Sequence, residues 1–167
     1  TLISKNGLIL TNKHIFDYVG IDSTIKINFI NDEQTYIANI FDISENYDLC
    51  LLKIEKNTSC FKNFSQHIRV AEEVYTIGNI NGFGLSYQCG LISSEYKNMY
   101  YNETNILTIQ TTIEIYNGSS GGPLFDSKGN LLGIMTFRIK DNGIFIPGMS
   151  FAIPTIILEE YLGELKI

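Results

Sequence analysis

Basic residues are few in this sequence, and they form no run. Lysine and arginine number 12 and aspartate and glutamate 18 among 167 residues, which gives a formal net charge of −6. Domains that bind nucleic acids typically present a basic patch to the phosphate backbone. We therefore expect no nucleic-acid partner.

Cysteine is also scarce. Cys50, Cys60 and Cys89 are an odd number without a C-x-x-C spacing, so the sequence predicts neither a disulfide framework nor a zinc site. We expect no metal and no cofactor. Cys50 stands within the apolar stretch 49–52, which favours a small core residue over a reactive thiol.

Long apolar runs are absent as well. No stretch approaches the roughly 18 to 20 residues that a membrane-spanning helix needs, and no signal-peptide pattern opens the chain. The sequence therefore predicts no membrane-spanning segment, although the absence of a signal peptide does not exclude export.

The sequence does contain many short apolar segments separated by turn residues. With 44% hydrophobic residues, it suits one compact unit or two small barrels. A hairpin is predicted over 3–11, and further strands over 24–30, 34–43, 49–54, 74–77, 86–93, 106–112, 131–139 and 149–153. Polar connections are predicted at 58–71 and 94–105, one or two helical turns at 12–19, and a helix at 154–162. Such spacing is typical of an all-β barrel or sandwich.

The segment 117–124, Asn-Gly-Ser-Ser-Gly-Gly-Pro-Leu, is the most informative stretch of the chain. Glycines let a backbone reach conformations closed to other residues, so the amide of Ser120 and a neighbouring amide can point at one spot, as in an oxyanion hole. A plain glycine turn is the alternative. The choice depends on whether the chain supplies a base and an acid.

Only two histidines are available as a base for Ser120. His14 follows a predicted strand end, whereas His67 lies in a polar irregular stretch and is interpreted as exposed. Asp48 directly precedes the apolar run 49–54, which draws its carboxylate toward the interior. Asp17, three residues from His14, is interpreted as a surface charge. A serine nucleophile needs a base and an orienting acid, and His14, Asp48 and Ser120 are the candidates.

Several motifs together resemble the protease domain of the trypsin-like serine proteases, most of all the HtrA (Deg) branch. They are Gly-Leu-Ile-Leu-Thr-Asn-Lys-His at 7–14, Asp-Leu-Cys-Leu-Leu-Lys-Ile at 48–54, Ile-Gly-Asn at 77–79 with Gly-Leu-Ile-Ser at 90–93, the segment 109–124, and 129–134 with 151–154. The resemblance implies an all-β, chymotrypsin-like fold of two packed six-stranded antiparallel barrels, at about 1–70 and 71–153, followed by a helix at 154–162. It makes 1–167 a single protease domain.

The resemblance also implies roles for the candidate residues. Ser120 attacks the scissile carbonyl, His14 acts as base and then as acid, and Asp48 orients the imidazole. The backbone amides of Gly118 and Ser120 form the oxyanion hole, where losing one donor typically costs about 10² to 10³ in rate.

The sequence departs from the family pattern at several places. Ser119 stands where the branch usually has Asn and the digestive enzymes have Asp, so activation by a newly cleaved N-terminal ammonium is not expected. Thr112 replaces a usual Asp. The first barrel lacks its N-terminal strand unless residues precede Thr1, and there is no room for a PDZ domain after Ile167 in this chain. Trimerisation in this branch depends on N-terminal residues, so the oligomeric state stays open. The family resemblance favours an extracytoplasmic location.

The substrate pocket is expected to be walled by residues on both sides of the nucleophile. The expected lining residues are Glu114, Ile115, Met135, Thr136 and Phe137. Ile115 favours a small or medium aliphatic side chain at the substrate P1 position, whereas a Glu114 carboxylate at the base of the pocket would select lysine or arginine. Both alternatives stay open.

Three functions fit these observations. The first is a serine endopeptidase that acts on unfolded or exposed peptide segments bound as an added strand. The second is a protease-like binding or scaffold module with an inactive or collapsed oxyanion loop, and the third is a processing protease of the viral type with a few defined junctions. The intact set of His14, Asp48, Ser120 and Gly118 favours the first.

Overall fold

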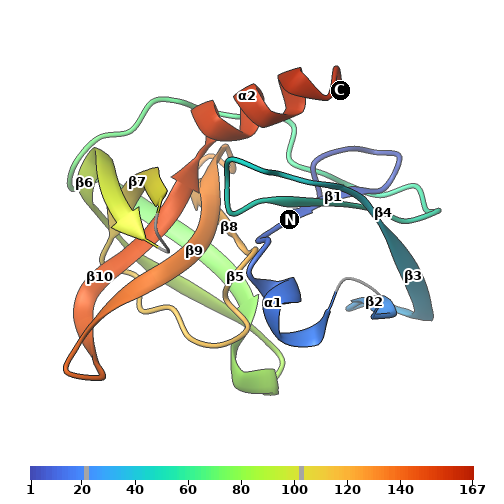
Figure 1. Cartoon of the computed structure of the whole chain (residues 1–167), viewed down its shortest axis with the longest axis horizontal. Coiled ribbons are helices and arrows are strands. Elements are labelled where there is room, and N and C mark those ends of the chain that lie inside the picture. Colours follow the sequence, from blue (N-terminus) through green and yellow to red (C-terminus); the bar gives the residue numbers. More distant parts are fainter. Residues whose placement is uncertain (21–22, 102–103) are drawn as a thin grey trace. The chain divides into compact units, whose positions relative to one another are not determined.

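The computed structural model describes residues 1–20, 23–101 and 104–167. It divides the chain into two compact units, Thr1–Phe61 and Lys62–Ile167. Both units consist mainly of β-strands, with a C-terminal helix in the second (Figure 1). The predicted all-β class is therefore confirmed.

The first unit is built on a four-stranded antiparallel sheet. Its strand order is β1 (Leu8–Thr11), β4 (Cys50–Lys53), β3 (Asp32–Ile43) and β2 (Ile25–Phe29). The short helix α1 (Ile15–Val19) connects β1 to β2. The resemblance implied a six-stranded first barrel, which lacks its N-terminal strand unless residues precede Thr1. Within its described residues this unit instead has a four-stranded sheet, and the chain before β1 adds only a bridge between Leu2 and Ile9.

The neighbouring strands β1 and β4 supply fully buried residues to the core of this unit. Leu10 pairs with Leu51 and both are fully buried. Neighbouring residues along each strand point to opposite faces, yet Ile9 and Cys50 are buried too. Burial on both faces explains why these strands are continuous apolar runs rather than alternating ones. Cys50 is thus a core residue, as predicted.

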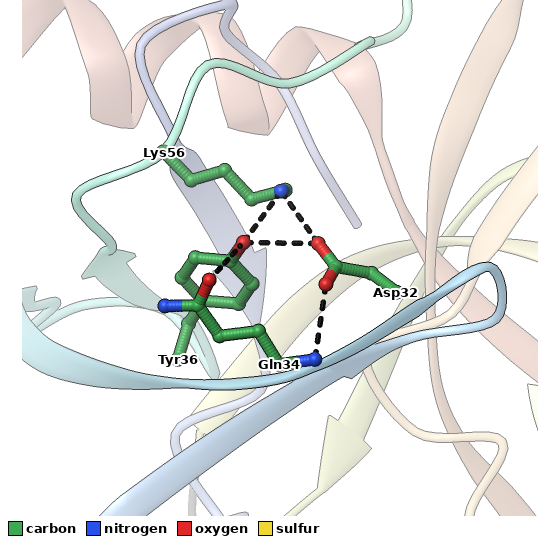
Figure 2. A network of polar contacts seen from close by, with 4 residues as sticks. All are labelled: Asp32, Gln34, Tyr36 and Lys56. Carbon is green, nitrogen blue, oxygen red and sulfur yellow. Dashed lines mark hydrogen bonds and ion pairs between the residues drawn. The ribbon is translucent and has the colours of Figure 1, made fainter.

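A polar network joins the β2–β3 hairpin to the segment that follows β4 (Figure 2). The ammonium group of Lys56 donates hydrogen bonds of 2.7 Å to the Asp32 carboxylate and to the Tyr36 hydroxyl. The backbone N–H of Gln34 donates to the other Asp32 oxygen at 3.0 Å. The network adds polar contacts to the apolar packing of the hairpin, since Phe29 and Tyr36 also pack against the core of the unit.

The second unit is a closed barrel of six antiparallel strands. The order around the barrel is β10 (Ile144–Pro154), β7 (Thr104–Thr111), β6 (Leu85–Tyr101), β5 (Glu73–Asn79), β8 (Pro123–Asp126) and β9 (Leu131–Asp141). A closed barrel leaves no unpaired strand edge. Its interior is filled by aliphatic side chains from every part of the unit, including Val74, Ile92, Ile109, Leu124 and Ala152.

The hairpin of β6 and β7 corrects one sequence prediction. Residues 94–105 were predicted to be a polar connection, but β6 continues to Tyr101 and β7 begins at Thr104, with Asn98 paired to Leu107. Residues 102–103 of that predicted connection lie outside the described part. Residues 95–98 are exposed although they are in a strand, so they show no apolar alternation that could reveal it.

The helix α2 (Thr155–Glu164) follows β10 directly and matches the predicted helix with small shifts at both ends. Pro154 precedes its first residue with extended geometry. Leu158, Tyr161 and Leu162 are buried, which gives the helix one apolar side. The short 3₁₀-helix η1 (Ile80–Gly82) connects β5 to β6.

Candidate active site

His14 and Asp48 lie in contact in the first unit. His14 Nδ1 is 2.7 Å from Asp48 Oδ2, and the backbone N–H of His14 donates to Asp48 Oδ1 at 2.8 Å. The side chains are 22% and 12% exposed, so the pair is shielded from most of the solvent. A carboxylate at Nδ1 fixes the proton there, which leaves Nε2 as the acceptor.

The loop that carries Asp48 is held from two sides. Within it, the backbone N–H of Tyr47 donates to Ser44 Oγ at 3.0 Å, and the N–H of Ser44 donates to the carbonyl of Leu49 at 3.0 Å. From the end of β1, the buried side chain of Asn12 donates to the Asp48 carbonyl at 3.1 Å. Lys13 Nζ donates to the Ser44 carbonyl at 2.9 Å.

Asn12 and Lys13 were not predicted as site residues. Their position directly before His14 was the only signal, and the sequence does not show that their side chains reach a loop more than 30 residues away. The two alternatives to the pair are solvent-facing, since Asp17 on α1 and His67 in the second unit are both exposed.

Ser120 lies in a tight loop of the second unit. Its hydroxyl donates to the backbone carbonyl of Thr136 on β9 at 3.2 Å. The preceding Ser119 is 1% exposed, and its hydroxyl oxygen accepts the N–H of Tyr116 at 3.1 Å. The carbonyl of Ser119 accepts the N–H of Gly122 at 3.0 Å. These bonds close the loop upon itself.

Gly118 occupies a position that only glycine fits. Its φ is +91°, and a Cβ atom there would stand 2.0 Å from the carbonyl oxygen of Asn79. The carbonyl of Asn117 accepts the N–H of Asn81 at 2.8 Å. Since carbonyl and N–H point in opposite directions in a trans peptide, the N–H of Gly118 is directed away from Asn81.

The expected pocket residues all lie in the second unit, near this loop. Ile115 and Met135 belong to the apolar core of the barrel. Thr136 is buried, and the ring of Phe137 stacks on Phe151 with centroids 5.0 Å apart. Of the five expected residues, these four have buried side chains.

Glu114 differs from the other expected pocket residues because its side chain is partly exposed. Its Oε1 accepts the backbone N–H of Gly148 on β10 at 3.0 Å, and its backbone carbonyl accepts a hydrogen bond of 2.6 Å from Gln88 Nε2. The carboxylate is therefore anchored to the barrel wall.

The described part of the chain holds neither a metal-binding cluster of side chains nor a membrane-spanning helix. Over residues 1–20, 23–101 and 104–167, no group of three or more His, Cys, Asp or Glu side chains could hold a metal ion. None of the helices in those ranges has the length and apolarity needed to cross a bilayer.

Comparisons with known proteins show the family to which the chain belongs. A family model described as a trypsin-like peptidase domain matches residues 1–134. A probable periplasmic serine endoprotease DegP-like from Hahella chejuensis is 34% identical over 167 residues, which cover 99% of this chain and 34% of that protein. A protein of the same description from Chlamydia pneumoniae is 30% identical, with coverage of 98% and 33%. The chain thus spans about a third of the length of these relatives.

Solved structures give the same result. The HtrA-type protease AlgW with a decapeptide superposes with a TM-score of 0.86 at 31% identity, covering 98% of this chain and 49% of that one. AlgW with a tripeptide gives a TM-score of 0.87 at 30% identity, with coverage of 99% and 54%. The chain therefore belongs to the trypsin-like peptidase family and is related to its HtrA (Deg) branch.

Proposed function

We propose that this chain is the protease domain of a serine endopeptidase. Ser120 Oγ attacks the carbonyl carbon of the scissile peptide bond while His14 Nε2 takes the hydroxyl proton. The tetrahedral intermediate then expels the amine, which receives that proton from His14. A water molecule, deprotonated by His14, attacks the resulting acyl-enzyme ester, and His14 returns that proton to Ser120 Oγ as the acid product leaves.

The observation that carries this proposal is the contact between His14 Nδ1 and Asp48 Oδ2. It selects the imidazole tautomer whose Nε2 can accept a proton, and it stabilises the imidazolium that forms in the transition state. The amides of Gly118 and Ser120 are the proposed oxyanion donors. For Gly118 the support is the hydrogen bond from Asn81 N–H to the Asn117 carbonyl, which directs the Gly118 N–H away from Asn81.

The substrates we propose are exposed or unfolded segments of proteins. AlgW, an HtrA-type protease, has been solved with a decapeptide and with a tripeptide, which supports peptides as ligands. The curated relatives are named periplasmic endoproteases, and on that ground we propose an extracytoplasmic place of action.

A fluorophosphonate probe tests the proposal, because it phosphonylates a serine only where a base and an oxyanion hole are formed. We expect a single adduct, located at Ser120 by mass spectrometry, and hydrolysis of casein. Ser120→Ala should lose both, whereas Ser127→Ala, which changes an exposed serine in the turn after β8, should keep both. A folded protein without adduct or hydrolysis would instead indicate a protease-like binding module.

A further inference from the structure

The side chain of Arg138 on β9 contacts two aromatic rings. Its guanidinium carbon is 3.0 Å from the ring centroid of Phe145 on β10 and 4.6 Å from that of Tyr116. Tyr116 is the first residue of the segment 116–122 that carries Ser120, here called the serine loop. Arg138 therefore connects the hairpin of β9 and β10 to the start of the serine loop.

The backbone of Tyr116 closes the turn that carries the first proposed oxyanion donor. The Ser119 N–H donates to the Tyr116 carbonyl at 2.9 Å, and the Tyr116 N–H donates to Ser119 Oγ at 3.1 Å. Gly118 is the third residue of this four-residue turn and has a φ of +91°, as a type II turn requires. The peptide between Asn117 and Gly118 is thus the central peptide of the turn, and its rotation would redirect the Gly118 N–H.

The ring of Tyr116 is not fixed by burial, because this residue is 40% exposed. A guanidinium over an aromatic face gains cation–π attraction, and its flat shape also stacks on the ring. One such contact is worth roughly threefold to thirtyfold in an equilibrium constant. The second contact, with Phe145, ties the same guanidinium to the β9–β10 hairpin, so the cation restrains the Tyr116 ring.

From these contacts we infer that Arg138 is a positioning residue for the serine loop. Through the ring of Tyr116 it holds the turn of residues 116–119 in the conformation that directs the Gly118 amide toward the substrate carbonyl. The inference rests on the proposed peptidase function. Arg138 acts through Tyr116 in this role and takes no part in proton transfer.

A pair of matched variants on β9 tests the inference. Arg138→Gln removes the cation and keeps an unbranched polar side chain. Lys140→Gln is the control, because the Lys140 ammonium is 4.4 Å from the Phe145 ring centroid and, within the described residues, lies over no other ring. We expect Arg138→Gln to lower both the rate of fluorophosphonate labelling at Ser120 and the kcat on a peptide substrate by roughly threefold to thirtyfold, with KM little changed. Lys140→Gln should keep the parent values.

Variants of Tyr116 test the other end of the contact. Tyr116→Leu removes the aromatic face and should reproduce the loss, whereas Tyr116→Phe keeps the ring and should lose less. The Arg138→Gln, Tyr116→Leu double variant should lose no more than Tyr116→Leu alone, because both changes remove the same contact. Arg138→Lys keeps a cation and should recover part of the labelling rate.

Amide hydrogen exchange gives a readout that does not depend on catalysis. The Ser119 N–H exchanges when the turn opens, so Arg138→Gln should raise its exchange rate by roughly threefold to thirtyfold. The reference is the Asp126 N–H, which donates to the Asn130 carbonyl at 3.1 Å in another turn of the same unit. Its exchange rate should stay at the parent value.

Two results would overturn the inference. One is an Arg138→Gln protein that labels at Ser120 as fast as Lys140→Gln does, and the other is an equal rise in exchange at Ser119 and Asp126, which would show general destabilisation. If Arg138→Gln does not fold, Tyr116→Leu and Tyr116→Phe decide, since equal labelling rates in these two would contradict the role of the ring. Failure of the proposed peptidase function has a different signature, a parent protein without labelling, while exchange at Ser119 still reports on the turn.

Discussion

Replacing Gly118 by alanine tests the geometry of the serine loop most directly. The new Cβ would stand 2.0 Å from the Asn79 carbonyl oxygen, whereas 3.0 Å is the shortest separation that real Cβ atoms show. One of the two backbones must therefore move by 3.0 − 2.0 = 1.0 Å or more. Asn79 ends β5 and is paired there with Leu85, so we expect the peptide of residue 118 to move.

The expected loss follows from that displacement. An oxyanion donor acts only about 2.7 to 3.1 Å from the developing charge, and removal of one donor costs about 10² to 10³ in kcat. The positive φ adds a backbone strain of about 1 to 2 kcal/mol for a residue with a Cβ. Gly118→Ala should thus lower kcat/KM on a peptide substrate by about 10² to 10³ and lower the thermal unfolding midpoint modestly.

Gly129→Ala is the matched control. Gly129 has a φ of +80°, close to that of Gly118, but a Cβ there meets no atom within 4 Å. The control therefore has the backbone strain without the steric conflict. It should lose stability, measured by thermal unfolding, and keep its kcat/KM. The reasoning is refuted if Gly118→Ala retains the kcat/KM of the control, or if both variants lose activity in proportion to their stability.

Three further outcomes follow from other parts of the chain. Asp48→Asn should keep the fold but lower kcat by about 10⁴, because the amide no longer selects the productive imidazole tautomer; steady-state kinetics and a thermal unfolding curve measure the two effects. The hydrogen bond from Lys56 lowers the pKa of Asp32 to about 2. The ionised Asp32 carboxylate therefore stabilises the fold above about pH 4, and this stabilisation is lost as the pH falls toward 2. Urea unfolding should show this loss in the parent protein but not in Asp32→Asn. Burial raises the pKa of the Cys50 thiol to about 12, so Ellman's reagent should label the exposed Cys89 in the folded protein and Cys50 only after unfolding.

The strands that could be predicted are those that bury one face or both. The alternating apolar residues of 24–30 correspond to β2, and the continuous apolar run of 49–54 corresponds to β4. Both patterns are visible in the sequence because burial of one face or of both faces determines which positions are apolar. The outer part of the β6–β7 hairpin gave no such signal. Its backbone groups pair with one another while the side chains of residues 95–98 are exposed, so nothing in the sequence distinguished it from a loop.

The residues of the candidate site differ in whether the sequence alone could point to them. His14, Asp48 and Ser120 were chosen because few residues of the chain can act as base, acid or nucleophile, and such scarcity is visible in a sequence. Asn12 contributes an ordinary amide, and only the structure shows that it bonds to the carbonyl of Asp48. The guanidinium of Arg138 lies over the rings of Tyr116 and Phe145, and such contacts between distant residues cannot be read from the sequence.

The shape of the serine loop follows from bonds that the loop makes to itself. Ser119 accepts the N–H of Tyr116 at its hydroxyl, donates its own N–H to the Tyr116 carbonyl at 2.9 Å, and accepts the N–H of Gly122 at its carbonyl. A buried, neutral hydroxyl offers no counter-charge to an ammonium group, whereas a carboxylate at the same place would need one. The direction of the Gly118 and Ser120 amides therefore depends on these bonds and on the two positive-φ glycines of the loop, Gly118 and Gly121. Because Ser119 carries no charge, we expect no pairing between this position and a charged chain end.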